Sequence, residues 1–298
     1  MTDMGMPDEV PGVVRSGALK RSDRSIGAVL IDAGRLRPED AQRILRLHHE
    51  KGLRFGDAGK ALGLLNQADI EFALSRQFDY SYLTRGESSV SEEVVAAYDP
   101  FSRQVESLRA VRSQLMLRWF DFEPPRKALA IVSGAPNEGR SFIAANLAVL
   151  FSQLGKRTLL IDADMRNPRQ HQLFGLDNRA GLSAVLSGRA GPESVQHVPA
   201  LQHLSVLPAG TPPPNPLELL SRPIFAELLH QLAAQLDVIL LDSPATGETA
   251  DAQIIAVRAG AALIVARKSA TRLWRVQGVS DSVAQAKATI VGAVLNDF

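Results

Sequence analysis

The sequence predicts an α/β fold built on a doubly wound parallel sheet, preceded by a small helical domain made of a tandem repeat. Three observations support this prediction: short apolar runs alternating with amphipathic stretches after residue 125, a 29-residue repeat before residue 84, and a glycine-rich loop behind the first apolar run. Short continuous apolar strands separated by amphipathic helices are typical of a parallel sheet covered on both faces. With 298 residues, the chain is long enough for two domains.

Six apolar runs are expected to form the strands of the sheet: 128–132, 158–161, 204–207, 238–241, 262–266 and 290–295. Amphipathic stretches between them predict helices at 141–154, 216–235, 250–258 and 272–286. A further amphipathic helix is expected from Phe101 to Trp119, because Pro124 and Pro125 end it. We assign residues 101–298 to this α/β domain.

Residues 24–83 repeat themselves with a period of 29 residues. Ser25-Ile26-Gly27 aligns with Arg54-Phe55-Gly56, and the pairing continues through Gly34/Gly63, Leu36/Leu65, Asp40/Asp69, Leu45/Leu74 and His48/Gln77. An exact period indicates internal duplication, and each copy predicts a short helix, a glycine-containing turn and an amphipathic helix. We interpret residues 1–23 as a disordered leader and residues 84–100, which contain Gly, Ser and Pro, as a linker.

Composition excludes several classes of function. The chain contains no cysteine, which excludes disulfides, thiol catalysis and thiolate metal sites. Its 33 basic and 32 acidic residues nearly balance, so we expect no nucleic-acid partner. The apolar stretches are shorter than the ~20 residues of a membrane-spanning helix, and the N-terminus lacks the apolar region of a secretory signal. We therefore expect a cytoplasmic protein that reaches the inner face of the plasma membrane through a partner.

A phosphate-binding loop is predicted between the first strand and the following helix. The segment Gly134-Ala-Pro-Asn-Glu-Gly-Arg-Ser141 matches the pattern G-x-x-x-x-G-K-[ST], with Arg140 at the lysine position. Glycines let backbone amides wrap a phosphate, the helix N-terminus supplies partial positive charge, and a hydroxyl completes a Mg²⁺ shell. The alternative is an ordinary glycine-rich turn. The residues expected to contact nucleotide are Gly134, Glu138, Gly139, Arg140, Ser141 and Phe142.

Acidic residues follow two further strands. Asp162 and Asp164 come directly after the run 158–161, and Asp242 follows the run 238–241. Ligands of open parallel sheets bind outside the carboxyl ends of the strands, so these acids and the loop are expected to meet in one crevice. Acids at strand ends are also common as solvated helix caps, but three in this order favour a ligand site.

From Phe101 to its end, the chain resembles the bacterial tyrosine kinases of capsule and exopolysaccharide export, and within them the chain-length-determinant kinases that carry an extra N-terminal domain. The resemblance rests on the phosphate loop and on five further segments: Glu106-Ser-Leu-Arg109-Ala-Val-Arg112, Asp162-Ala-Asp164-Met-Arg166, Leu207-Pro-Ala-Gly210, Asn215-Pro-Leu-Glu218 and Val291-Gly-Ala-Val-Leu-Asn296. It implies a P-loop NTPase fold with ATP and Mg²⁺ as cofactors. It also implies protein-tyrosine phosphorylation that regulates exopolysaccharide polymerisation, chain length and export, together with a separate membrane-bound chain-length-determinant protein.

The resemblance implies a role for each matched residue. Ser141 would hold Mg²⁺ through its hydroxyl, and Asp242 would hold it through water. Asp162 would be the Mg²⁺-linked carboxylate nearest the transferred phosphoryl group and the proton acceptor for a tyrosine hydroxyl. Asp164 would act beside it as a second acid, with Arg140 as the cation of the loop. Phosphoryl transfer needs mainly positioning and charge neutralisation, which this set can provide.

The helix that carries Glu106, Arg109 and Arg112 resembles the segment through which subunits of the family associate in rings. The sequence therefore predicts a homo-oligomer formed through this helix. Its spacing puts the three side chains on about one helical face. A solvated helix whose charges pair with each other is the alternative.

Two departures from the family bear on activity. Arg140 keeps the positive charge of the usual lysine, but its planar fork is bulkier and places its donors differently. The family's kinases usually end in a tyrosine-rich tail, whereas the tyrosines of this sequence are Tyr80, Tyr82 and Tyr98, so transfer to a tail is not expected. The alternative function is a nucleotide-binding scaffold with little or no kinase activity. Partitioning ATPases carry an extra lysine where Ala135 stands, which disfavours that branch.

Residues 24–83 resemble the N-terminal domain of type II secretion and type IV pilus ATPases. In some of those proteins, tandem copies of a motif near R-L-G-x-x-L, ending in Gln, bind cyclic di-GMP. The second copy here keeps Arg54, Gly56 and Gln77, while the first has Ser25 and His48 in place of the arginine and glutamine. The resemblance leaves two hypotheses for this domain, a helical docking module and a cyclic di-GMP site.

Overall fold

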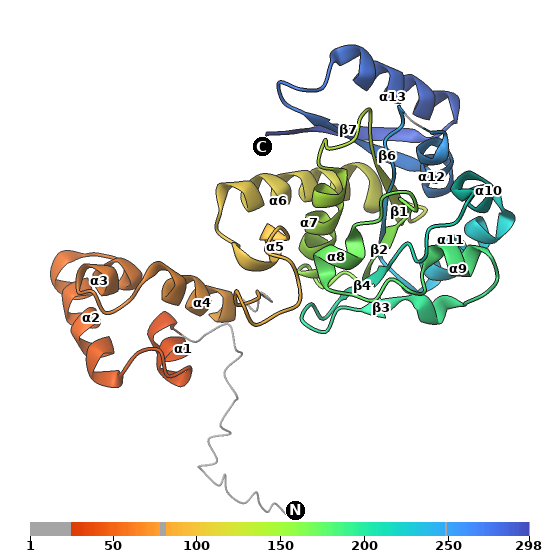
Figure 1. The fold of residues 1–298 in the computed structure, drawn as a ribbon. Coiled ribbons are helices and arrows are strands. Elements are labelled where there is room, and N and C mark those ends of the chain that lie inside the picture. Colours follow the sequence, from red (N-terminus) through yellow and green to blue (C-terminus); the bar gives the residue numbers. More distant parts are fainter. Residues whose placement is uncertain (1–24, 78–81, 248, 298) are drawn as a thin grey trace, which may run out of the picture. The chain divides into compact units, whose positions relative to one another are not determined.

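The computed structural model describes residues 25–77, 82–247 and 249–297, and the chain divides into two units between Tyr80 and Ser81. The predicted leader, residues 1–23, lies outside the described residues. Figure 1 colours the N-terminal unit in red and orange and the C-terminal unit from yellow-orange to blue. Within the described residues, no helix has the length and apolar character needed to cross a membrane.

The N-terminal unit follows the predicted repeat. Its described helices are α1 (Ile26–Asp32), α2 (Pro38–Lys51), α3 (Phe55–Ala61) and α4 (Gln67–Gln77), so the second pair begins 29 residues after the first. The fully buried Ile44 and Ala73 are likewise 29 residues apart, and they share one small core with Leu30 and Ala58. The duplication therefore produces two equivalent helix pairs around a common core.

A parallel sheet organises the C-terminal unit. Its strand order is β3-β4-β2-β5-β1-β6-β7, and all neighbouring strands are parallel except β3 and β4. The strands are β1 (Ala128–Ser133), β2 (Thr158–Asp162), β3 (Gln196–His197), β4 (Leu204–Leu207), β5 (Val238–Asp242), β6 (Ala261–Arg267) and β7 (Thr289–Asn296). The six predicted strands are confirmed. The two-residue β3 was not predicted, because it is too short to produce an apolar run.

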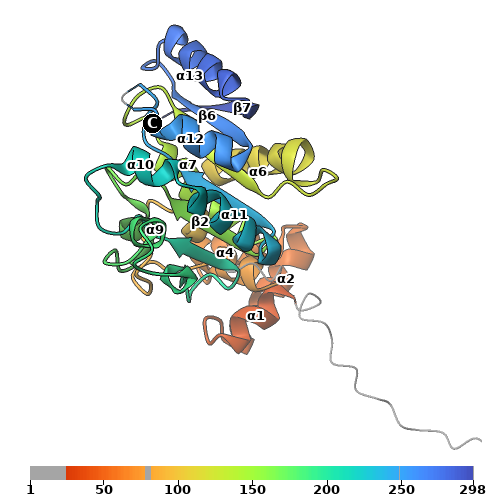
Figure 2. The same ribbon diagram turned by 90° about the vertical axis from the view of Figure 1, so that its right-hand side faces the viewer.

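Helices cover both faces of this sheet, which confirms the predicted doubly wound architecture. One face packs against α5 (Val95–Tyr98), α6 (Arg103–Leu115), α7 (Arg140–Ser152) and α8 (Gln170–Phe174). The other packs against α9 (Leu182–Leu186), α10 (Pro216–Ser221), α11 (Pro223–Gln235), α12 (Asp251–Ala259) and α13 (Leu273–Gln285). Figure 2 shows α9, α10 and α11 in front of the strands. Side chains of β1 alternate between the two cores, with Leu129 and Ile131 in the first and Ala130 and Val132 in the second.

The interpretation of residues 84–100 as a linker is wrong, because this segment belongs to the C-terminal unit. Its Val94, Ala96 and Ala97 are fully buried in the core beneath α6 and α7. The backbone N–H of Ala96 donates to Oδ1 of Asn146 on α7 at 2.8 Å. The glycine and serine content of the segment obscured its apolar positions, which are buried in the core.

The helix predicted from Phe101 to Trp119 changes pitch near its end. Helix α6 stops at Leu115, and a π-helical turn (η2, Met116–Phe120) continues it. This wider turn buries Trp119 and Phe120, and the Trp119 indole N–H donates to the carbonyl of Ala128 at 2.9 Å. The end of the helix is thereby fixed to the start of β1. A short 3₁₀ turn (η3, Pro192–Ser194) precedes β3 on the other side of the unit.

Two neighbouring aliphatic residues of the N-terminal unit are predicted to contribute very differently to its stability. Ile44 is fully buried and Leu45 is 43% exposed. We expect Ile44→Ala to lower the free energy of unfolding of this unit by about 2–5 kcal/mol, because it leaves a cavity, and Leu45→Ala to change it by about 0.5 kcal/mol or less. Hydrogen exchange of residues 26–74 in the full chain measures both. Equal protection in the two variants would contradict the assigned core.

Candidate functional site

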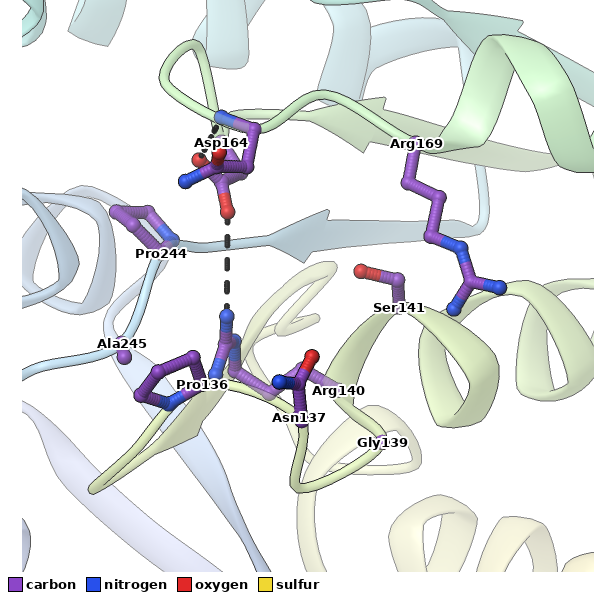
Figure 3. A pocket seen from close by; sticks show the side chains of 10 residues that line it. Pro136, Asn137, Gly139, Arg140, Ser141, Asp164, Arg169, Pro244 and Ala245 are labelled. Atoms are coloured by element: carbon purple, nitrogen blue, oxygen red, sulfur yellow. Dashed lines mark hydrogen bonds and ion pairs between the residues drawn. The ribbon is translucent and has the colours of Figure 1, made fainter.

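The predicted phosphate loop joins β1 to α7 and forms the floor of a cavity of about 380 Å³. Gly139, the last residue before α7, has a φ of +92°, a conformation that residues with a side chain rarely adopt. The loop therefore requires glycine at this position to turn into the helix. Figure 3 shows the cavity, which is lined by Pro136, Asn137, Gly139, Arg140, Ser141, Asp164, Asn167, Arg169, Pro244 and Ala245.

Arg140 braces the loop from inside. Its Nε donates to the carbonyl of Ser243 at 2.7 Å, and its Nη1 donates to the carbonyl of Ala135 at 3.0 Å and to the hydroxyl of Ser133. The third nitrogen, Nη2, lies 3.9 Å from the Asp164 carboxylate (Figure 3). The cation thus lines the cavity as predicted, but its directed hydrogen bonds hold the loop to the end of β5. A lysine has a single nitrogen and could not make the same set.

Asp162 and Asp242 lie side by side at the ends of adjacent strands. They are paired in the register of β2 and β5, and both are fully buried. Oδ2 of Asp162 accepts the backbone N–H groups of Arg169 and Gln170, each at 2.9 Å, at the start of α8. Oδ1 of Asp162 and Oδ1 of Asp242 have no hydrogen-bond partner. Two buried carboxylate oxygens are therefore left without a donor or cation, which is a costly arrangement.

The electrostatics of this pair follow from its burial. Burial raises the pKa of Asp162 well above its usual range near 3.8, and the neighbouring negative charge of Asp242 raises it further. Burial also raises the pKa of Asp242, against the opposing effects of Arg140, Ser141 and Gln170. A cation beside the pair would offset both causes.

Gln170 is a site residue that the sequence reasoning missed. Its side-chain amide donates to Oδ2 of Asp242 at 2.7 Å and to the carbonyl of Ser141 at 3.2 Å, while its backbone N–H binds Asp162. One fully buried residue therefore contacts both carboxylates and the start of α7. No motif marks a glutamine eight residues after the first acid, and only the position of α8 reveals it.

Asp164 has a different environment from Asp162. Its Oδ1 accepts the backbone N–H groups of Arg166 and Asn167 at 3.2 and 2.9 Å, and its other oxygen faces Arg140. Asp164 lines the cavity, whereas Asp162 and Asp242 are not among the residues that line it. The structure thus brings the three predicted acids to one edge of the sheet but places only Asp164 at the cavity wall.

Three residues predicted to contact nucleotide, Gly134, Glu138 and Phe142, do not line this cavity, and Gly134 lines a neighbouring one instead. The Glu138 carboxylate accepts the backbone N–H of Ala135 at 3.0 Å and the hydroxyl of Thr271, so it ties the loop to the segment after β6. Phe142 packs against the core between the sheet and α6. Both side chains support the loop, and their contact with nucleotide stays a prediction.

The residues present fit a Mg²⁺–nucleotide site. Within the described ranges there is no cluster of three or more His, Cys, Asp or Glu residues able to hold a metal alone. Mg²⁺ in phosphate sites usually takes one or two protein ligands and completes its shell with phosphate oxygens and water. Ser141, which lines the cavity and carries a hydroxyl, and the unpartnered carboxylate oxygens match that requirement.

The charged residues predicted to mediate self-association are engaged within the chain. Arg109 binds Glu106 at 3.2 Å and the Tyr82 hydroxyl at 2.8 Å. Arg112 donates to the carbonyl of Leu150 near the end of α7 at 3.1 Å. Glu106 remains 74% exposed on its side chain. This arrangement matches the alternative of a self-paired helix, and ring formation through α6 stays a prediction.

The N-terminal unit shows part of the predicted dinucleotide motif. Arg54 precedes α3, is exposed, and forms no capping hydrogen bond through its side chain. His48 contacts the carbonyl of Leu53 through Nδ1. The side chain of Gln77 lies outside the described residues. The cyclic di-GMP hypothesis stays a prediction.

Comparisons with known proteins find relatives over about two thirds or more of the chain. A family model described as "ParA: NUBPL iron-transfer P-loop NTPase" matches residues 125–297. The tyrosine-protein kinase YwqD of Bacillus subtilis is 36% identical over 209 residues, which are 70% of this chain and 87% of that protein. The putative tyrosine-protein kinase EpsB of Ralstonia nicotianae is 34% identical over 77% of this chain, which spans only 29% of that longer protein. The kinase domain of the Escherichia coli tyrosine kinase ETK superposes with a TM-score of 0.67 and 30% identity, covering 72% of this chain and 83% of that domain.

The hydrogen bonds of Gln170 predict a stability contrast within α8. We expect Gln170→Met to lower the free energy of unfolding by about 1–3 kcal/mol, because it removes a donor from a buried carboxylate. Gln172→Met is the matched control, since Gln172 is exposed on the same helix, and we expect a change of about 0.5 kcal/mol or less. Chemical denaturation measures both. If Gln170→Met left the free energy of unfolding unchanged, the hydrogen bond from this side chain would not stabilise the buried carboxylates.

The raised pKa of Asp162 predicts a pH-dependent effect of its removal. A carboxyl with a raised pKa binds its proton more tightly in the folded state, so folding stability falls as pH rises from the usual value near 3.8 through the raised pKa. Asp162→Asn removes this titration but keeps an oxygen for the N–H groups of α8. Without nucleotide and Mg²⁺, we expect the Tm of the variant, relative to the Tm of the native protein, to increase as pH rises from about 4 to about 8. A Tm difference independent of pH would contradict the assigned environment.

Proposed function

Because the chain belongs to the bacterial tyrosine kinases, a family of P-loop nucleotide-binding proteins, we propose that it transfers phosphate from Mg²⁺–ATP to protein tyrosine. The observation that carries this proposal is the buried pair of carboxylates, Asp162 and Asp242, with unpartnered oxygens beside a phosphate loop. A purely structural pair would not leave both oxygens without donors. A cation held by phosphates would complete them.

Each residue of the site has a role in this proposal. Bound Mg²⁺ would neutralise charge on the phosphates, and Ser141 and Asp242 would hold it. The backbone amides of the loop, fixed by Arg140 and Glu138, would cradle the phosphates. We assign acceptance of the tyrosine proton to Asp162, because its Oδ1 has no hydrogen-bond partner and the resemblance to the kinases implies this role for the acid. Asp164, hydrogen-bonded to the turn that follows it, would orient Arg140.

The biological setting is also a proposal. We place the protein in exopolysaccharide polymerisation, chain length control and export, at the inner face of the plasma membrane, with a separate membrane-bound chain-length-determinant protein as its partner. Oligomers would form through α6, with the exposed Glu106 as the charge available to a neighbouring copy. For the N-terminal unit, we retain the helical docking module, because the comparisons give the cyclic di-GMP hypothesis no support.

The alternative is a nucleotide-binding scaffold with little or no transfer activity. Arg140 favours it, because hydrogen bonds to Ser243, Ser133 and Ala135 direct the guanidinium donors into the protein. In that case nucleotide binding alone would gate the export complex.

Arg140→Lys separates the two functions. We expect the variant to transfer phosphate to tyrosine about tenfold or more faster than the native protein. The reason is that a lysine ammonium cannot make the hydrogen bonds of Arg140 within the protein and is therefore free to donate to the β- and γ-phosphates. We also expect a lower Tm, since the brace between the loop and β5 is lost. The measurements are phosphotyrosine formation and nucleotide affinity in the same preparations. Unchanged transfer with intact nucleotide binding would support the scaffold.

A further inference from the structure

A second cavity, of about 400 Å³, lies against the phosphate loop and is not used by the proposed chemistry. Its walls come from the loop itself, from Thr246 and Gly247 after β5, and from one side of α13. The two cavities share Pro136 as a lining residue. A chain segment seated in the second cavity would therefore lie directly beside the phosphate cavity.

The packing around this cavity couples it to the loop. A Cβ on Gly134, the first residue of the loop, would come within 3.1 Å of the Arg275 Cβ. A Cβ on Gly247 would come within 2.7 Å of the Gly134 carbonyl oxygen. Both the hydroxyl and the backbone N–H of Thr246 donate to the carbonyl of Ser133, at 3.0 and 2.9 Å. The glycines thus let α13 and the loop after β5 contact the phosphate loop closely.

The first turn of α13 presents an apolar and aromatic surface next to the cavity. Leu273 is 72% exposed and Trp274 is 59% exposed, both unusually high for large apolar side chains. Trp274 lines the cavity, and the Arg275 guanidinium lies 5.2 Å from the centre of its ring. Exposed tryptophan and arginine side chains are the residue types that most often dominate protein recognition surfaces.

The charge of this surface is positive and uncompensated. Arg272 and Arg275 are both exposed, the first turn of α13 has no acidic residue, and neither arginine forms an ion pair with a carboxylate of the described chain. An acidic ligand would complement these charges.

From this geometry we propose that the cavity beside Trp274 and Arg275 docks an acidic, tyrosine-containing segment of the protein substrate. The proposal rests on the proposed kinase function and names its substrate class. Acidic side chains pair with Arg272 and Arg275, an apolar or aromatic side chain packs on Trp274, and the segment continues past Pro136 to place a tyrosine at the phosphate cavity.

Tryptophan emission of the full chain tests docking independently of catalysis. The chain has two tryptophans, and Trp119 is buried, so a ligand at the cavity changes the emission of Trp274. The probe is a random copolymer of glutamate and tyrosine, with a lysine–tyrosine copolymer as the comparison. We expect only the acidic copolymer to shift the tryptophan emission to the blue, and we expect Trp274→Phe to abolish this shift. We expect the half-saturating concentration to rise about tenfold in Arg275→Glu. Arg189 is also exposed and lies outside both cavities, so the Arg189→Glu variant should bind the copolymer as the native protein does.

Phosphate transfer to the same copolymer separates failure of docking from failure of the kinase function. Copolymer binding without transfer would leave the docking site standing and refute the kinase. Transfer with the same KM in the native protein and in Arg275→Glu would refute the docking site and leave the kinase standing. Equal shifts with both copolymers would refute charge selection. A shift that appears on raising the protein concentration alone would assign this surface to a second copy of the chain, which also overturns the proposal.

Discussion

The site depends on two buried carboxylates that adjacent parallel strands hold side by side and that the surrounding residues compensate only in part. Asp162 and Asp242 are register partners at the ends of β2 and β5, fully buried, and each keeps one oxygen without a partner. Folding must bring these charges together and remove them from water, at a cost that hydrogen bonds from Gln170 and the start of α8 offset only in part. The contacts of the surrounding residues reduce this cost.

Arg140 supplies a positive charge close to these carboxylates, and its hydrogen bonds bear both on the conformation of the loop and on the proposed rate of phosphate transfer. The guanidinium opposes the rise that burial causes in the pKa of Asp242, faces Asp164, and hydrogen-bonds the ends of β1 and β5. A guanidinium bonded in this way holds the loop in its conformation. The same hydrogen bonds compete with any phosphate for its donors. The presence of Arg140 at the usual lysine position is therefore expected to affect both the conformation of the loop and the rate of phosphate transfer.

The sequence was sufficient for the architecture and for the location of the site. Apolar runs identified every strand of the sheet except β3, and strand-end acids identified the edge of the sheet at which the candidate site lies, because both signals are local. Burial and pairing were not predictable, since they depend on how separate elements meet. Gln170 and the brace made by Glu138 required the positions of α8 and the segment after β6. The segment 84–100 was misjudged because its glycine and serine content outweighed a few buried apolar residues.

Phosphotyrosine mapping by mass spectrometry after incubation with Mg²⁺–ATP tests the central claim most directly. Of the chain's tyrosines, Tyr98 is buried with its hydroxyl on the Val90 carbonyl, so it is a poor acceptor, and an added glutamate–tyrosine copolymer provides accessible ones. The account predicts phosphotyrosine with the native protein and none with Asp162→Asn, although both bind nucleotide. Equal phosphotyrosine in the two proteins would contradict the role of the carboxylate pair, and none in either, with nucleotide bound, would identify a scaffold.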